Sequence, residues 1–301
     1  MSLVVVGSVA FDSLKTPFGD APEILGGAAT HFSVTSSYFV PVRVVAVVGE
    51  DFREEHLMVF RNRGIDTTGL EQAKGKTFRW VAEYSGAMNE ARTLDTQLNV
   101  FEHFAPKVPP SYKDSECVFL ANIQPKLQLQ VREQFPSARI VAMDTMNFWI
   151  QGTPDDLKAT LKRVDILTIN EAEARMLSGT HNLVKAAKAV QALGPRLVIV
   201  KRGEYGVISF NGDTVFSVPA YPLEEVHDPT GAGDSFAGGF MGHLARSGDL
   251  TEQNLRRAMV YGSVMASFAV EEFGLQRTAR LTTSEIEARY REFKNLTHFD
   301  V

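Results

Sequence analysis

Short apolar runs rich in Val and Ile alternate with segments of helical periodicity along most of this 301-residue chain. The runs lie at residues 3–7, 42–48, 118–121, 139–143, 166–169 and 197–201. Runs of this kind are typical of parallel strands that are buried on both faces. Helical periodicity falls between them, at residues 28–38, 53–63, 155–163, 171–177 and 182–193. The alternation predicts an α/β fold with a central, mostly parallel sheet and helices on both faces.

Two stretches follow a different pattern, in which apolar and polar side chains alternate. They lie at residues 76–84 and 94–104, on either side of a turn at 86–89. They predict a hairpin with one face in water, and residues 11–25 offer a further strand. We interpret these pieces as a small β-sheet inserted in a single α/β domain of residues 1–301, with lid segments at about 12–25 and 76–104. An ordinary edge hairpin is the equal alternative to a cover over a site.

The last third of the chain predicts a second hairpin and then long helices. The strands of this hairpin are residues 207–210 and 214–218, and the tight-turn sequence Asn-Gly-Asp separates them. Helical stretches follow at residues 233–246, 252–270 and 283–294.

Composition and missing motifs exclude several classes of protein. The formal net charge of −5 gives no reason to expect nucleic acid as a partner. The single cysteine, Cys117, excludes an internal disulfide and a cysteine-based zinc cluster. No apolar stretch approaches the roughly 18 residues of a membrane helix, and the first residues lack the basic region of a signal peptide. No P-loop motif, HExxH motif or protein-kinase catalytic loop occurs. We therefore expect a soluble cytoplasmic protein without a nucleic-acid or membrane partner.

Residues 228–239, with the sequence Asp-Pro-Thr-Gly-Ala-Gly-Asp-Ser-Phe-Ala-Gly-Gly, are the most informative stretch for function. Gly231 and Gly233 let backbone N–H groups approach a ligand, and the following helix adds its unpaired N–H groups and positive end. The turn therefore predicts an anion site of the kind that holds phosphate. A carboxylate beside such a site repels the ligand unless it has a chemical task, and a natural task for Asp234 is to take a proton from an attacking hydroxyl. The alternative is that Asp234 only caps the helix.

This stretch resembles the signature of the ribokinase-like (PfkB) carbohydrate kinases, which transfer the γ-phosphoryl group of ATP to a hydroxyl of a sugar or nucleoside. The resemblance implies the ribokinase-like fold with a small β-sheet lid. It also implies that Asp234 is the catalytic base, and that the backbone amides of Gly231, Ala232 and Gly233 form the anion hole for the transferring group.

Positions nearer the N-terminus continue the resemblance in the order expected for the family. Residues 7–12 resemble its first strand and substrate-binding aspartate, and Gly26-Gly27 resembles its sugar-contacting pair of glycines. The resemblance therefore implies substrate contacts at Asp12, Gly26 and Gly27. Alternatively, Asp12 only forms part of a turn. His31 stands where the family usually has a substrate-contacting asparagine. It either marks a different substrate or packs in the core.

Later positions resemble the nucleotide site of the family. Asn170 and Glu173 match its Asn-x-x-Glu motif, which implies that Glu173 binds Mg²⁺ through water. The same two residues fit a capping box at a helix start, and both interpretations hold together. Lys201 falls in the loop that borders the nucleotide in the family and could pair with a phosphate. From the residue type alone, a lysine exposed to solvent is the alternative. The nucleotide contacts that the resemblance implies are Asn170, Glu173, Lys201, Gly203, Gly206, Ser263 and Gly274.

Some members of the family also bind a monovalent cation. The positions that ring this cation are matched here by Asp228, Thr230, Ala269, Glu272, Gly274 and Thr278. Most of those contacts are backbone carbonyls, so the resemblance allows K⁺ beside ATP and Mg²⁺ without requiring it.

Two features bear on the substrate. Residues 144–149 resemble an Asp-Pro-Asn-x-Arg segment of the family, but the arginine is missing, which disfavours a sugar phosphate because that substrate needs a basic clamp. The predicted hairpin is rich in aromatic residues, namely Phe78, Trp80, Tyr84, Phe101 and Phe104. These rings are suited to stacking on a sugar or a base. Alternatively, they pack inside the lid or form a contact between two copies of the chain. A flat exposed hairpin also favours pairing with a second copy of the chain.

The resulting hypothesis is an ATP-dependent kinase for a sugar or nucleoside. A relative that binds a sugar or nucleotide without catalysis is the alternative from another class, and a kinase for a pyridoxal-type vitamin precursor is a third. The intact Asp234 argues against a pure binding protein, which gains nothing from a carboxylate that faces phosphate.

Overall fold

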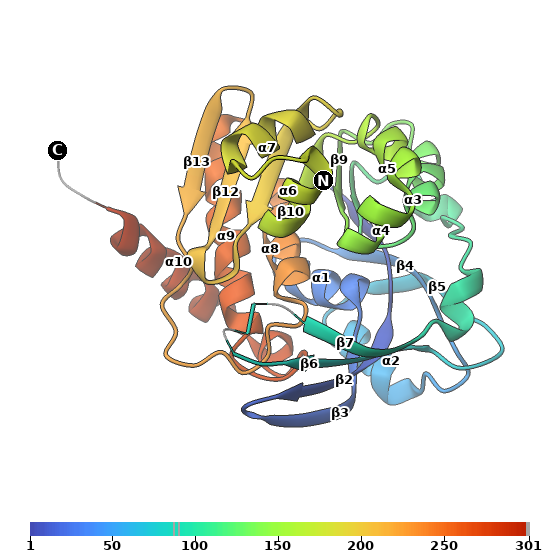
Figure 1. The fold of residues 1–301 in the computed structure, drawn as a ribbon. Coiled ribbons are helices and arrows are strands. Elements are labelled where there is room, and N and C mark those ends of the chain that lie inside the picture. The colour runs from blue at the N-terminus through green and yellow to red at the C-terminus, as the bar shows by residue number, and fades with distance from the viewer. Residues whose placement is uncertain (87, 90, 299–301) are drawn as a thin grey trace.

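The computed structural model describes residues 1–86, 88–89 and 91–298, and its largest element is a nine-stranded sheet (Figure 1). The strand order is β13-β12-β11-β10-β9-β8-β1-β4-β5. The strands are β1 (Leu3–Val6), β4 (Val42–Val48), β5 (Asp66–Gln72), β8 (Cys117–Leu120), β9 (Ile140–Asp144), β10 (Ile166–Asn170), β11 (Leu197–Lys201), β12 (Val207–Asn211) and β13 (Thr214–Val218). All pairs from β5 to β11 are parallel, and β12 and β13 add an antiparallel edge.

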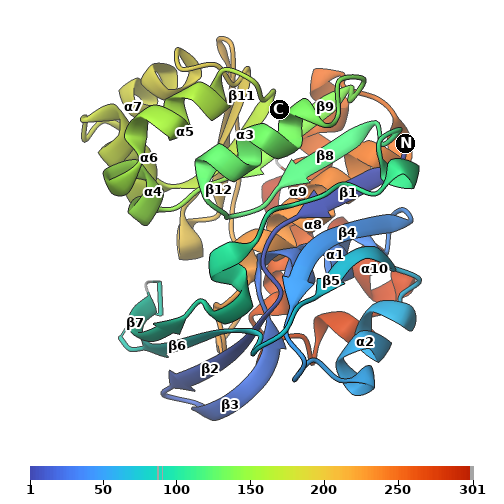
Figure 2. The same cartoon turned by 90° about the vertical axis from the view of Figure 1, so that its right-hand side faces the viewer.

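Helices cover both faces of this sheet (Figure 2). Alternate residues of β1 point to opposite sides, so that Val5 joins one core cluster and Val4 the other. The helices that pack in the first cluster are α1 (Ala28–Ser36), α2 (Glu54–Arg61), α8 (Ala232–Ser247), α9 (Glu252–Ala269) and α10 (Thr283–Thr297). Those in the second are α3 (Pro125–Glu133), α4 (Asn147–Gly152), α5 (Pro154–Leu161), α6 (Glu171–Ser178) and α7 (Leu183–Gln191). The predicted α/β sandwich is confirmed.

A separate four-stranded sheet lies at the bottom of Figure 1. Its order is β3-β2-β6-β7, from β2 (Ala10–Thr16), β3 (Gly19–Gly26), β6 (Phe78–Tyr84) and β7 (Ala91–Gln97). Each hairpin is antiparallel, and the two join through the parallel pair of β2 and β6. The predicted small β-sheet is thus confirmed, and we call it the second sheet.

Some predicted element boundaries were wrong. Residues 94–104 are not one strand, because β7 ends at Gln97 and a 3₁₀ helix, η1 (Asn99–His103), follows. Residues 11–25 form both strands of a hairpin rather than one strand. The predicted turn at 86–89 includes Ala87, which lies outside the described residues. Sequence patterns also missed α3, although Pro125 at its first turn is a helix-start signal.

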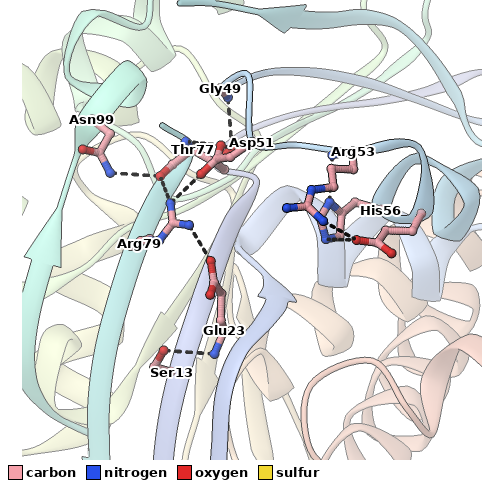
Figure 3. A network of polar contacts seen from close by, with 10 residues as sticks. Ser13, Glu23, Gly49, Asp51, Arg53, His56, Thr77, Arg79 and Asn99 are labelled. Carbon is pink, nitrogen blue, oxygen red and sulfur yellow. Dashed lines mark hydrogen bonds and ion pairs between the residues drawn. The ribbon is translucent and has the colours of Figure 1, made fainter. Parts of the chain in front are cut away.

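A polar network anchors the second sheet to the end of β4 (Figure 3). The Asp51 carboxylate accepts hydrogen bonds from the Thr77 amide at 2.8 Å and the Thr77 hydroxyl at 2.7 Å. Its other oxygen accepts from Arg79 of β6 at 2.7 Å, and the same guanidinium also pairs with Glu23 of β3. One arginine therefore links both hairpins of the second sheet to the nine-stranded sheet.

Cys117 is fully buried in β8, as its place in an apolar run predicts. Within the described ranges, no helix is both long and apolar enough to span a bilayer.

Candidate active site

Three neighbouring parallel strands end in polar residues at the same edge of the nine-stranded sheet. Asp144 is the last residue of β9, Asn170 of β10 and Lys201 of β11. Ligand sites in open α/β sheets form outside the carboxyl ends of the strands. This edge, together with the start of α8, is therefore the candidate active site.

The turn at the start of α8 exposes backbone donors. Gly231 is the N-cap and has φ 72°, in the left-handed region that favours glycine. The Ala232 amide donates to the Pro229 carbonyl at 3.2 Å, but the amides of Gly231 and Gly233 have no acceptor in the described part of the chain. The positive end of a helix of 16 residues adds to these donors, so the turn is arranged to bind an anion.

His31 of α1 lies directly behind this turn. A Cβ at Gly231 would lie 2.3–2.5 Å from three atoms of the imidazole ring, so only glycine fits there. The ring is 1% exposed, and neither of its nitrogens has a hydrogen-bond partner among the described residues. Burial lowers the pKa of His31 to about 4, so the ring is neutral at physiological pH. His31 therefore packs against the anion turn.

The structure brings Asp12 close enough to Asp234 for the charge of Asp234 to raise the pKa of Asp12. Burial, with the charge of Asp144, raises the pKa of Asp234 to about 7, although Lys201 opposes the shift. Asp12 is 4% exposed, and burial raises its pKa to about 7 as well, with added repulsion from Asp228 and Asp234. Two carboxyl groups with pKa values near neutrality thus lie in one site. A pKa in this range suits a group that accepts a proton from a hydroxyl at neutral pH.

The two glycines at the end of β3 pack around Asp12. A Cβ at Gly26 would lie 1.9 Å from the Oδ2 atom of Asp12, and one at Gly27 would lie 2.6 Å from the Ser8 carbonyl oxygen. Gly27 also has φ 92°. Glycine is therefore needed at Gly26 because the chain passes close to the carboxylate, and at Gly27 because of its positive φ and its closeness to the backbone of Ser8.

Lys201 places a cation at the anion turn. Its Nζ donates to Oδ2 of Asp144 at 2.7 Å, and a Cβ at Gly233 would lie 2.8 Å from the same Nζ. Burial alone would lower the pKa of Lys201, but Asp144 and Glu173 raise it above its ordinary value. The lysine is therefore a paired, charged group rather than a solvated one.

Asn170 and Glu173 form the capping box of α6. The Glu173 amide donates to Asn170 Oδ1 at 2.8 Å, and the Asn170 amide donates to Glu173 Oε2 at 3.0 Å. Glu173 is buried, which together with the charge of Asp144 raises its pKa to about 7. The carboxylate thus caps the helix while facing the acidic side of the site.

A cavity of about 620 Å³ opens beside the anion turn. The predicted nucleotide residues that line it are Asn170, Lys201, Gly203, Gly206 and Ser263, and the anion-turn residues that line it are Ala232 and Gly233. The hydroxyl of Ser263 is buried there without a hydrogen-bond partner in the described structure. The cavity therefore joins an anion site to an apolar chamber, a shape suited to a nucleotide.

Two predicted nucleotide residues do not line this cavity. Glu173 is hydrogen-bonded to Asn170 but is not among the lining residues, and Gly274 lies against Ile24 of the second sheet. The Gly274 amide instead donates to Asp228 Oδ2 at 2.8 Å, and the Thr230 amide donates to Oδ1 of the same carboxylate at 2.8 Å. Asp228 thus braces the loop that carries the anion turn.

The other residues predicted for a monovalent cation lie near this brace. Thr278 is buried and donates to the Leu275 carbonyl at 3.4 Å, and the Glu272 carboxylate pairs with Arg280. The side chains of Asp228 and Glu272 already have internal partners, so a cation here would depend on backbone carbonyls.

Sequence analysis named two further members of the site, Asp144 as the start of the 144–149 segment and Tyr84 among the aromatic residues of the hairpin, but not the contacts that they make. Asp144 follows an apolar run in the same way as Lys201, so the rule of polar strand ends identifies it. Tyr84 of the second sheet accepts a hydrogen bond from the Thr230 hydroxyl at 3.2 Å, and burial raises its pKa to about 12. Only the folding of a distant hairpin over the turn brings Tyr84 there, and no sequence pattern signals this contact.

Comparison with known proteins gives one consistent result. The sequence model described as pfkB family carbohydrate kinase matches residues 23–281. The cytidine kinase of Thermococcus kodakarensis is 30% identical over 261 residues, which are 84% of this chain and 91% of that protein. Burkholderia thailandensis nucleoside kinase in complex with inosine superimposes with a TM-score of 0.80 at 18% identity, covering 98% and 99% of the two chains. A candidate ribokinase II of E. coli in complex with ATP and Mg²⁺ gives a TM-score of 0.79 at 20% identity, covering 97% and 99%.

Proposed function

Because this chain belongs to the pfkB family of carbohydrate kinases, we propose that it transfers the γ-phosphoryl group of ATP to a hydroxyl of a sugar or nucleoside, and that a nucleoside is the preferred acceptor. One observation carries the proposal. The anion turn of α8 opens on the 620 Å³ cavity on one side and has the Asp234 carboxyl group beside it. A donor phosphate and an acceptor hydroxyl therefore have adjoining places.

The anion turn holds the group in transfer. In this proposal the unpaired amides of Gly231 and Gly233 and the Lys201 ammonium, which lies close to Gly233, stabilise the negative charge that develops on that group. Donors fixed in place before the reaction stabilise that charge without reorganisation. Their rigidity follows from the packing of His31 behind Gly231.

Asp234 is the general base in this proposal. The acceptor oxygen forms a bond to the γ-phosphorus, the bond from that phosphorus to the bridging oxygen of ADP breaks, and the hydroxyl proton passes to the Asp234 carboxylate. A pKa of about 7 suits a base that must accept a proton at neutral pH. Asp12 orients the acceptor by hydrogen bonds to its hydroxyl groups.

Mg²⁺ would be held at the edge of the cavity, beside Asn170, which lines it and which is hydrogen-bonded to Glu173. In the described ranges, no three His, Cys, Asp or Glu side chains are grouped so as to enclose a metal ion. Mg²⁺ keeps several waters and takes few protein ligands, so Glu173 is an adequate holder through water. Mg²⁺ bound there would neutralise charge on the phosphates.

The acceptor end favours a neutral, partly apolar molecule. Asp12, Asp228 and Asp234 place acidic groups there, which would repel a sugar phosphate. Trp80 and Tyr84 share one face of β6 and pack in the core of the second sheet, so at the acceptor end this sheet contributes the Tyr84 hydroxyl, which accepts a hydrogen bond from Thr230. The similarity to the cytidine kinase of Thermococcus kodakarensis supports a nucleoside as the acceptor substrate. The second sheet then serves as a lid over the acceptor.

A substrate panel tests the proposal. Nucleosides, free sugars, sugar phosphates and pyridoxal are each incubated with Mg·ATP, with and without K⁺, and ADP formation is measured. We expect turnover with one or more nucleosides and little with sugar phosphates. Ligand binding without ADP formation across the whole panel would identify a binding protein and overturn the proposal.

A further inference from the structure

Asp144 and Lys201 form an ion pair across an intervening strand. They end β9 and β11, and β10 lies between these strands in the sheet. Asp144 is 5% exposed, and its Oδ2 accepts from Lys201 Nζ at 2.7 Å while its Oδ1 accepts from the Thr145 amide at 2.8 Å. Both oxygens of this carboxylate are therefore fixed, and its position sets that of the ammonium.

Lys201 occupies a place that is unfavourable for a cation. Its ammonium and the end of its aliphatic stem lie within 2.8–3.6 Å of where a Cβ of Gly233 would be, in the first turn of α8. The N-terminal end of a helix carries partial positive charge and repels cations. A buried ion pair is also, in general, no more stabilising than apolar side chains of similar size. Fold stability alone therefore does not account for an ammonium at this position.

The remaining hydrogen-bonding capacity of Lys201 points to its use. An ammonium has three donors, and Asp144 is its one acceptor among the described residues. Lys201 also lines the cavity beside Ala232 and Gly233. Donors of the ammonium are thus left for an anion that the α8 amides bind at the same time.

We propose that Asp144 is a positioning residue that holds the Lys201 ammonium at the anion turn of α8, so that amides and ammonium bind one phosphoryl group together. The identity of that anion rests on the proposed kinase function. The pairing itself does not, because any phosphate-bearing ligand of the cavity meets the same donors.

A double-mutant cycle tests this dependence. The variants are Asp144→Asn, Lys201→Met and the double variant, with Asp165→Asn as the matched control. Asp165 accepts a hydrogen bond from the Val141 amide at 2.8 Å and precedes β10, at the opposite edge of the sheet. Each variant is assayed for kcat, for KM of ATP and of the acceptor, and for ATP affinity by calorimetry without acceptor. Thermal unfolding identifies variants that fail to fold.

We expect Lys201→Met to lower kcat by about 10²–10³-fold, the usual effect of removing one charged donor to the reacting group. Asp144→Asn should lower kcat by about 10–100-fold, since it loses a hydrogen bond between charged groups. In the Lys201→Met background, Asp144→Asn should change kcat by less than about threefold, because its effect passes through the lysine. Asp165→Asn should leave all kinetic constants near those of the wild type.

Two results would overturn the inference. If the two substitutions multiply in the double variant, Asp144 acts independently of Lys201. If excess Mg²⁺ restores Asp144→Asn but not Lys201→Met, Asp144 acts on the metal instead. Calorimetry distinguishes these results from failure of the kinase proposal. The coupling between the two substitutions can be measured in ATP affinity even if no acceptor is phosphorylated.

Discussion

The proposed phosphate end of the candidate site is built from backbone amides and the last residues of buried parallel strands, whereas the proposed acceptor end is built from side chains of two hairpins. The phosphate end rests on α8 and on strands whose neighbours fill both large core clusters. Among the described residues, the second sheet has a core cluster of its own with five buried members, including Leu14, Ala82 and Tyr84. The comparison separates a proposed phosphate site that the main fold fixes from a proposed acceptor site that depends on the placement of a smaller unit.

Asp234, at the junction of the two ends, gives the largest expected effect. Asp234→Asn should lower kcat by about 10²–10⁴-fold, the usual contribution of a general base. ATP affinity, measured by calorimetry, should stay within a few fold of the wild type because the amides of the turn remain. A near-wild-type kcat would remove Asp234 from the role of base, and the junction would then lie elsewhere.

The rigidity of the proposed phosphate end is tested by alanine substitutions at the two glycines that cap α8, Gly231 and Gly248. Gly231→Ala should lower the free energy of unfolding by about 1–2 kcal/mol for the left-handed backbone and by about 1–3 kcal/mol more for the collision with His31. Gly248, at the other end of the helix, has φ 66° and nothing within 4 Å of an added Cβ. Gly248→Ala should therefore lose only the backbone part. Equal losses in urea unfolding would show that the imidazole yields and that the turn is not tightly supported.

The raised carboxyl pKa values predict opposite pH profiles for stability and activity. Asp12 and Asp234 have pKa values near 7 in the folded protein, against an ordinary value of 3.8. Between about pH 4 and 7 the folded state then holds more protons than the unfolded state, so these groups make the free energy of unfolding fall as pH rises, with no further change above 7. Activity needs ionised Asp234, so kcat/KM should rise tenfold per pH unit up to about 7.

Denaturant unfolding and steady-state kinetics across this pH range check both profiles. The Asp12→Asn/Asp234→Asn double variant should lack the decline in stability that these two groups cause. If kcat/KM instead stops rising near pH 4, the base is a carboxylate with an ordinary pKa.

The same contrast explains what the sequence revealed. The strands and the glycine-rich turn carry local signals, because buried parallel strands are apolar throughout and a helix N-terminus that binds phosphate needs glycine. Asp144 carried such a signal too, as the polar end of a strand. By contrast, the contact of Tyr84 with Thr230 joins residues 146 positions apart, and the packing of His31 on Gly231 joins two helices. These contacts arise from tertiary packing, which no periodicity in the sequence encodes.

The smallest expected effect comes from the anchor of the second sheet. Arg79 links β6 to Asp51, beside the end of β4, and its side chain is 21% exposed. Arg79→Gln loses a partly buried ion pair of about 1 kcal/mol and should raise the acceptor KM by about fivefold or less. Arg92→Gln is the matched control, because Arg92 pairs with Glu83 within the second sheet and is mostly exposed.

ATP affinity decides what this last result means. If the two ends are separate structural units, Arg79→Gln changes the acceptor KM alone and Arg92→Gln changes neither constant. An equal rise in the dissociation constant for ATP would show that the second sheet also shapes the nucleotide cavity, which Met88 and Asn89 line from the connection between β6 and β7. The contact of Asn89 with Glu204 at 3.2 Å, on the loop after β11, would then be the route by which the acceptor end acts on the phosphate end.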